Sequence, residues 1–182
     1  IVEMALTDLI TNAQIMSIVV SLSLVFLIVA LTYRSFVAGI YGVIPLALTL
    51  VVNFGVMGFF GIKLDVSTAM VASIAIGIGI DYTIHFLSAY SAERRESDDL
   101  EQVELNVLST TGKAITFNAV SVAAGFAVLL LSNFYPLMYM GMLIALTMLT
   151  SSIASMTVLP VMLDVFTPAF MDPQRGWRRK ED

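Results

Sequence analysis

Five runs of apolar residues, each long enough to cross a lipid bilayer, constrain this chain more than any other feature of its sequence. A helix rises 1.5 Å per residue, so about 20 residues cross about 30 Å of hydrocarbon. Backbone polar groups inside lipid must bond within their own segment, which favours helices. The sequence therefore predicts an all-α, polytopic transmembrane helix bundle. Its five spanning helices are expected at about 15–33, 36–60, 66–90, 114–131 and 137–163.

Composition agrees with a membrane domain and excludes several classes of protein. Hydrophobic residues make up 58% of the 182 residues and charged residues 13%, against about 45–50% and about 25% in soluble domains. There is no cysteine and only one histidine, which excludes disulfide scaffolds and thiolate or histidine-rich metal sites. No phosphate-binding glycine loop or basic-aromatic surface is present, so no nucleic-acid partner, no cofactor and no enzymatic activity are expected.

The polar segments predict the parts outside the bilayer. Residues 1–14 mix acidic and apolar residues at helical spacing and predict an extramembrane lead-in helix. Residues 91–113 form the longest polar stretch, in which Asp98 followed by Glu101 resembles a capping box. Leu100, Val103 and Val107 share one stripe, which predicts a short amphipathic helix at the membrane surface. Residues 164–182 form a tail that ends in a basic cluster.

The basic residues predict the orientation. With five spans, Arg34, the 91–113 loop and the tail lie on one side, and Lys63 lies alone on the other. The positive-inside rule then places the loop and the tail in the cytoplasm and residues 1–14 outside a cytoplasmic (inner) membrane. The chain begins with Ile1, without the basic region of a signal peptide, and is expected to belong to a longer protein.

The third predicted span carries an acidic residue, Asp81, at mid-membrane depth. Ionisable groups in this position are rare and mark proton or ion pathways, so a functional carboxylate is favoured over one that only packs a helix. Small residues on the same helix allow another helix to approach closely, so the stripe is expected to face protein, and Gly79 widens it. The stripe recurs every four residues as Ala69, Ser73, Gly77, Asp81 and His85.

Two neighbours of Asp81 leave alternatives open. Tyr82 is either a hydrogen-bond partner that reaches another helix or an aromatic packing residue. His85 lies one turn further along and either passes a proton onward or is a packed, hydrogen-bonded group. On the fourth span, Asn118, Ser121 and Gly125 share one face with Ala114. They either line the same cavity as Asp81 or bond between helices.

The run Gly77-x-x-x-Asp81-Tyr82, followed by His85-Phe86, resembles the GxxxDY signature of the fourth and tenth transmembrane helices of RND-superfamily permeases. The most similar branch is that of the MmpL-like exporters, and sterol-sensing-domain proteins are more distant relatives. The resemblance implies that the five spans are the second to sixth helices of one half-permease, and the basic tail favours the C-terminal half. It also implies that Asp81 carries protons as the coupling ion, with Tyr82 as its partner across the two halves.

The resemblance further implies export of hydrophobic or lipid-like substrates, driven by the proton-motive force. Membrane lipid is an expected partner. Only one GxxxDY is present, so the other half of the same permease, or a second copy, is expected as partner. Drug-efflux relatives have two adjacent aspartates at this position, and Tyr82 takes the place of the second. The alternative function is a sterol-sensing-like regulatory membrane domain that binds lipid without transport. A third is a structural bundle in which Asp81 only packs.

Overall fold

The computed structural model describes residues 2–97 and 99–166, and in this part of the chain all regular structure is helical. Five of its helical segments are long and apolar enough to cross a membrane, which confirms the predicted all-α bundle with five spans. Of the expected tail at 164–182, the first three residues belong to α6, and residues 167–182 lie outside the described residues, as does Asp98. The elements are α1 Val2–Thr32, α2 Phe36–Phe59, α3 Val66–Glu93, α4 Leu100–Val107, the π-helical turn η1 Leu108–Gly112, α5 Lys113–Ala127, the 3₁₀ turn η2 Val128–Leu131 and α6 Tyr135–Phe166.

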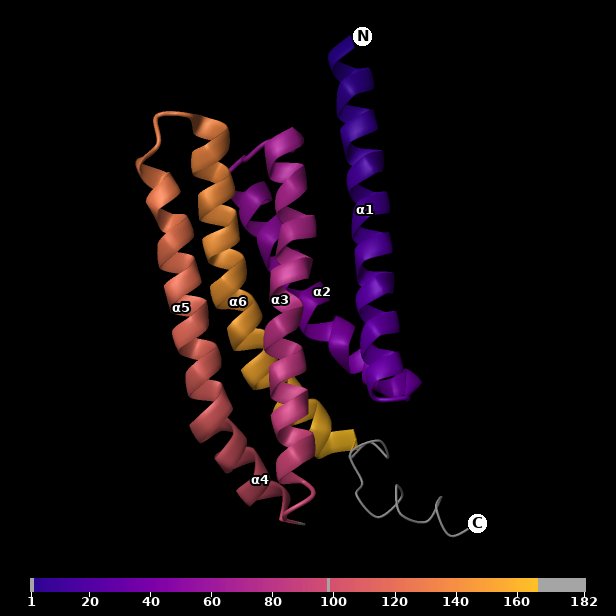
Figure 1. Cartoon of the computed structure of the whole chain (residues 1–182). Coiled ribbons are helices and arrows are strands. Elements are labelled where there is room, and N and C mark those ends of the chain that lie inside the picture. Colours follow the sequence, from indigo (N-terminus) through magenta and orange to yellow (C-terminus); the bar gives the residue numbers. More distant parts are fainter. Residues whose placement is uncertain (1, 98, 167–182) are drawn as a thin grey trace.

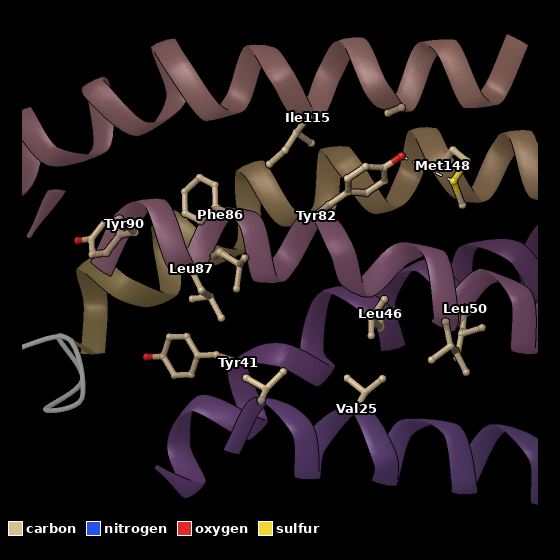
Figure 2. Close-up of a cluster of buried hydrophobic side chains, with 14 of the residues drawn as sticks. Val25, Tyr41, Leu46, Leu50, Tyr82, Phe86, Leu87, Tyr90, Ile115 and Met148 are labelled. Atoms are coloured by element: carbon tan, nitrogen blue, oxygen red, sulfur yellow. Dashed lines mark hydrogen bonds between the residues drawn. The ribbon is translucent and has the colours of Figure 1, made fainter. Parts of the chain in front are cut away.

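Helix α3 lies at the centre of the bundle, with α1 along one edge and α5 along the other (Figure 1). It packs most extensively on α6, and α6 in turn packs on α5 and α2. The turns α1–α2 and α3–α4 lie towards one end of the bundle, and the turns α2–α3 and α5–α6 lie at the other (Figure 1). Large side chains from all the long helices meet in one apolar core (Figure 2).

Helix α1 continues without a break from Val2 to Thr32. The predicted boundary at residue 14, between a lead-in helix and the first span, therefore does not interrupt the helix. Most of its apolar side chains beyond that boundary are exposed, including Leu24 and Leu31 at 54% and 67%. Since α1 packs on the bundle through one face only, the exposed apolar residues are those that a lipid phase would cover.

The polar segment after α3 does form a short amphipathic helix, α4, whose Val103 and Val107 are buried. Its N-cap is Asp99, one residue beyond the predicted Asp98, and the Asp99 carboxylate accepts from the backbone N–H groups of Glu101 and Gln102. Helix α4 then runs through η1 directly into α5. In that turn the Thr110 hydroxyl donates to the Asn106 carbonyl at 2.7 Å, and such competition for a backbone acceptor is a common cause of local helix distortion.

Buried polar side chains connect the helices inside the apolar core. The Asn53 amide of α2 donates to the Thr147 hydroxyl of α6, and the Thr83 and Ser155 hydroxyls of α3 and α6 lie 3.1 Å apart. Each bond satisfies groups that lipid could not solvate, so together they favour one register of α6 against its neighbours. The Gln14 amide nitrogen on α1 is also buried, and it has no hydrogen-bond partner among the described residues.

Candidate functional site

The candidate site lies near the middle of α3, which begins with a firm cap. The Asp65 carboxylate accepts from the Thr68 backbone N–H at 2.8 Å, and the Thr68 hydroxyl accepts from the Asp65 backbone N–H at the same distance. This reciprocal capping box satisfies two N–H groups that have no partner inside the helix. It was not among the predicted caps, although Asp followed by Thr at this spacing before an apolar run is its signal in the sequence. Asp81 lies about halfway along the capped helix.

One side of α3 carries Gly77, Asp81 and His85, and all three are exposed in this chain. We call this surface the open face. A Cβ atom added to Gly77 would meet nothing within 4 Å. Neither the Asp81 carboxylate nor the His85 ring has a hydrogen bond or ion pair with another described residue. The stripe was expected to contact protein. Within the described chain, none of these three residues makes such a contact.

Further along the same stripe, α1 covers α3. The Ser17 and Ser73 hydroxyls lie 2.7 Å apart and bond the two helices. Ser73 is half-buried, unlike the three residues of the open face. The stripe predicted from the sequence is thus divided: one part packs on α1, and the part that contains Asp81 is left uncovered.

Tyr82 points away from the open face and into the bundle (Figure 2), and only 3% of its surface is exposed. Its hydroxyl lies 3.4 Å from Oδ1 of Asn118 on α5 and 3.7 Å from the Met148 sulfur on α6. The Tyr82 side chain thus packs in the apolar core and also forms a hydrogen bond to another helix of the same chain. Consecutive residues on a helix differ in direction by about 100°, so Asp81 faces outward while Tyr82 faces inward.

Gly79 lies on the side of α3 that packs against α6 and α2. The Ser151 hydroxyl donates to the Gly79 carbonyl at 3.2 Å. A Cβ atom at this glycine would lie 2.8 Å from the Ser151 oxygen and 2.9 Å from a Leu46 methyl carbon. Gly79 therefore permits a close approach of α3 and α6, on a different side of the helix from Gly77.

Asn118, Ser121 and Gly125 lie on the exposed side of α5 or at its margin. A Cβ atom at Gly125 would meet nothing within 4 Å. Asn118 connects this polar side to Tyr82, whereas the Ser121 hydroxyl has no hydrogen bond to the described residues of α3. Among the residues that the structure describes, no three histidine, aspartate or glutamate side chains come close enough to hold a metal ion.

Comparison with known proteins places this architecture in a family. The MMPL family profile matches residues 4–181, nearly the whole chain. The chain is 26% identical to the putative membrane protein MJ1562 of Methanocaldococcus jannaschii over 156 residues, which are 86% of this chain and 40% of that protein. It is 32% identical to protein patched homolog 2 of Mus musculus over 132 residues, 69% of this chain and 10% of that protein.

A third relative is the probable trehalose monomycolate exporter MmpL3 of Mycobacterium leprae, 29% identical over 166 residues, 88% of this chain and 17% of that protein. The chain thus spans less than half the length of each of these relatives. The match over nearly all of the chain, the five membrane-spanning helices and the Gly77-x-x-x-Asp81-Tyr82 run agree with one another. The chain belongs to the MMPL family of multi-pass membrane proteins, within the RND superfamily.

Proposed function

We propose that this chain is one half of the membrane domain of an exporter driven by the proton-motive force, and that Asp81 is the proton carrier. The observation that supports this most directly is the position of Asp81, exposed on the open face halfway along a spanning helix. A carboxylate facing lipid at that depth is costly, so it requires a polar or protein cover. The other half of the same permease, or a second copy, would supply that cover.

The geometry suggests how proton binding is coupled to movement. An ionised Asp81 requires water or a hydrogen-bond donor, whereas the neutral acid tolerates a dry contact between helices. Protonation therefore shifts the equilibrium between an open, hydrated contact and a closed one. Tyr82, next in the chain, is bonded to Asn118 of α5, so a shift of α3 would be transmitted to that helix. His85, exposed one turn away, would exchange the proton with water at one end of the pathway.

Hydrophobic or lipid-like molecules are the proposed cargo. The similarity to a protein named for the export of trehalose monomycolate supports this class. The proposed location is the cytoplasmic membrane. The α1–α2 turn and the α3–α4 turn lie towards one end of the bundle, and the α2–α3 turn lies at the other (Figure 1). Arg34 belongs to the α1–α2 turn and Lys63 to the α2–α3 turn. By the positive-inside rule the first end is cytoplasmic, and the start of α1 is extracytoplasmic.

The test is Asp81→Asn in the full-length protein, reconstituted in vesicles with an imposed pH gradient. We expect substrate export and the accompanying proton flux to fall to the background of empty vesicles, because the amide cannot take up a proton. Asp65→Asn is the matched control: it is the same change on the same helix, outside the span, and asparagine also caps helices well. Coupled export at the wild-type rate in a folded Asp81→Asn protein would contradict the proposal.

The second candidate function is a sterol-sensing-like regulatory domain that binds lipid and does not pump. The 32% identity to patched homolog 2 is the observation that favours it. The same vesicles distinguish the two functions, because lipid binding and proton movement can both be measured in them. A regulatory domain would bind lipid to an extent that does not change with the pH gradient, and the wild-type protein would move no protons.

A further inference from the structure

A polar cavity of about 420 Å³ opens between α1 and α3, where both helices leave the predicted hydrocarbon region. It lies on the same side of α3 as the open face but closer to the end of the helix, since Ser88 follows His85 by three residues. Five of the six residues around it carry hydrogen-bonding side chains, and none is acidic. They are Thr32 at the end of α1 and Tyr33 directly after it, Ser88, Ser91 and Ala92 in the last turns of α3, and Arg95 in the turn that follows.

The donors in this cavity lie along one stripe of the chain. Ser88 and Ser91 are three residues apart, which places them on one side of α3, and Arg95 reaches the same cavity from the turn directly after the helix. Among the described residues, neither serine hydroxyl nor the Arg95 guanidinium has a hydrogen-bond partner or an ion pair. Arg94 differs, because its guanidinium bonds the Ser97 carbonyl. The stripe therefore presents two hydroxyls and one cation to the cavity, which suits an oxyanion.

The end of α1 holds the other wall in place. The Ser35 N–H donates to the Ala30 carbonyl at 3.0 Å and the Arg34 N–H to the Leu31 carbonyl at 3.3 Å. With Arg34 at φ 49°, these bonds form a Schellman motif in which arginine takes the position that glycine usually holds. The motif fixes Thr32 and Tyr33 at the cavity and adds a second arginine directly after them.

We propose that this cavity binds the phosphate of an anionic phospholipid. The position at the end of the spans places a bound phosphate at headgroup depth, where basic pockets between helices bind such lipids. An exposed apolar strip of α1 leads away from the cavity into the span, through Leu31, Ile28 and Leu24. Acyl chains of the bound lipid would lie along this strip. A free phosphate ion would make no use of it, which favours a lipid as occupant.

The proposal does not depend on proton transport. It is tested with the full-length protein, purified in detergent and freed of lipid. Phosphatidylglycerol, phosphatidylcholine and inorganic phosphate are added separately, and bound lipid is counted by native mass spectrometry while thermal unfolding is followed in parallel. We expect phosphatidylglycerol to bind and to raise the unfolding temperature, with weaker effects of phosphatidylcholine and no effect of inorganic phosphate at the same concentration.

Arg95→Gln is expected to weaken phosphatidylglycerol binding about tenfold or more, since hydrogen bonds to charged groups are the strong ones. Arg94→Gln is the matched control, because it removes the same charge one residue away from the cavity. Ser91→Ala, a change too small to disturb folding, is expected to weaken binding by a smaller factor. Equal weakening by Arg94→Gln and Arg95→Gln would overturn the site. Stabilisation by inorganic phosphate equal to that by phosphatidylglycerol would overturn the assignment to a lipid.

Discussion

The Tyr82 hydroxyl on α3 lies 3.4 Å from Oδ1 of Asn118 on α5, so the residue after the outward-facing Asp81 is bonded to a different helix. Tyr82 is buried and Asp81 is exposed. The two residues therefore connect a surface that is uncovered in this chain with the interior of the bundle. Under the proposed function, that connection gives a proton at Asp81 a physical route to helix movement.

The first prediction concerns this hydrogen bond. Tyr82→Phe removes only the hydroxyl, so the net loss of stability is expected to be about 0.5–1.5 kcal/mol. If the bond couples Asp81 to α5, export should fall severalfold or more while the protein stays folded. Proton-driven export in vesicles and thermal unfolding of the same preparation measure the two effects.

Tyr41→Phe is the control for this prediction. The Tyr41 hydroxyl donates to the Met162 carbonyl at 3.0 Å, in another part of the core. Tyr41→Phe also removes one buried tyrosine hydroxyl, so a similar loss of stability is expected, with export unchanged. A parallel fall of export in both variants would show that export follows stability and not the Tyr82–Asn118 bond.

The second prediction compares two glycines of α3. Gly79→Ala places a methyl group within 3 Å of Ser151 and Leu46 and is expected to destabilise the bundle by about 1–3 kcal/mol. Gly77→Ala meets open space and gains up to about 1 kcal/mol of helix propensity. In detergent, the unfolding temperature of this chain should therefore fall in Gly79→Ala and rise in Gly77→Ala. In the full-length protein, a defect of Gly77→Ala in export without loss of stability would indicate that another helix contacts the open face.

The third prediction concerns the cap of α3 and its dependence on pH. Burial raises the pKa of the Asp65 carboxyl, but hydrogen bonds from Ser67 and Thr68 outweigh it, so the pKa lies below its ordinary value. A lowered pKa in the folded state means that the cap contributes stability fully above the unfolded-state pKa of about 3.9. The contribution is lost as the pH falls through the lower pKa of the folded state. At neutral pH, Asp65→Ala should cost about 0.5–2 kcal/mol.

Thermal unfolding of wild type and Asp65→Ala between about pH 3 and pH 7 tests this. The difference between them should be constant at neutral pH and shrink only in the acidic range, below about pH 4. Asp65→Asn should keep most of the cap at all pH values, because asparagine is as good an N-cap residue. A difference that grows on acidification would contradict a lowered pKa of the Asp65 carboxyl.

The existence of the spans could be predicted from the sequence, because a long apolar run in lipid has few alternatives to a helix. The ends of the helices differ by a few residues from the expected limits of the spans. The second span was expected at 36–60 and α2 ends at Phe59; the third was expected to end at residue 90 and α3 continues to Glu93. Local bonds at helix ends decide such limits, and apolar composition changes little across them. The same holds for the boundary at residue 14, which the continuous α1 does not show.

Hydroxyl side chains show the limit of sequence reasoning within the bundle. Thr150 bonds the Leu146 carbonyl of its own helix at 2.9 Å, whereas Ser155 of the same helix meets Thr83 of α3. Both choices satisfy the hydroxyl in a medium without water, so residue type alone does not distinguish them. The same reason separates Gly77 from Gly79: two residues apart on a helix, one lies on the open face and the other against α6.

The sequence by itself determined that this chain has five helices long and apolar enough to span a membrane, that Asp81 lies about halfway along the third, and that the GxxxDY run belongs to an RND-type protein. The spans follow from the length of the apolar runs, and the interest of Asp81 follows from the cost of a carboxylate in lipid. The family follows from resemblance to known sequences, and none of the three needs knowledge of packing. Only the tertiary structure decided which side of α3 is covered. Spanning helices are apolar on every side, so the choice between helix contact and open surface depends on how helices fit against one another. That fit leaves Asp81 on the open face and buries Tyr82 against α5 and α6.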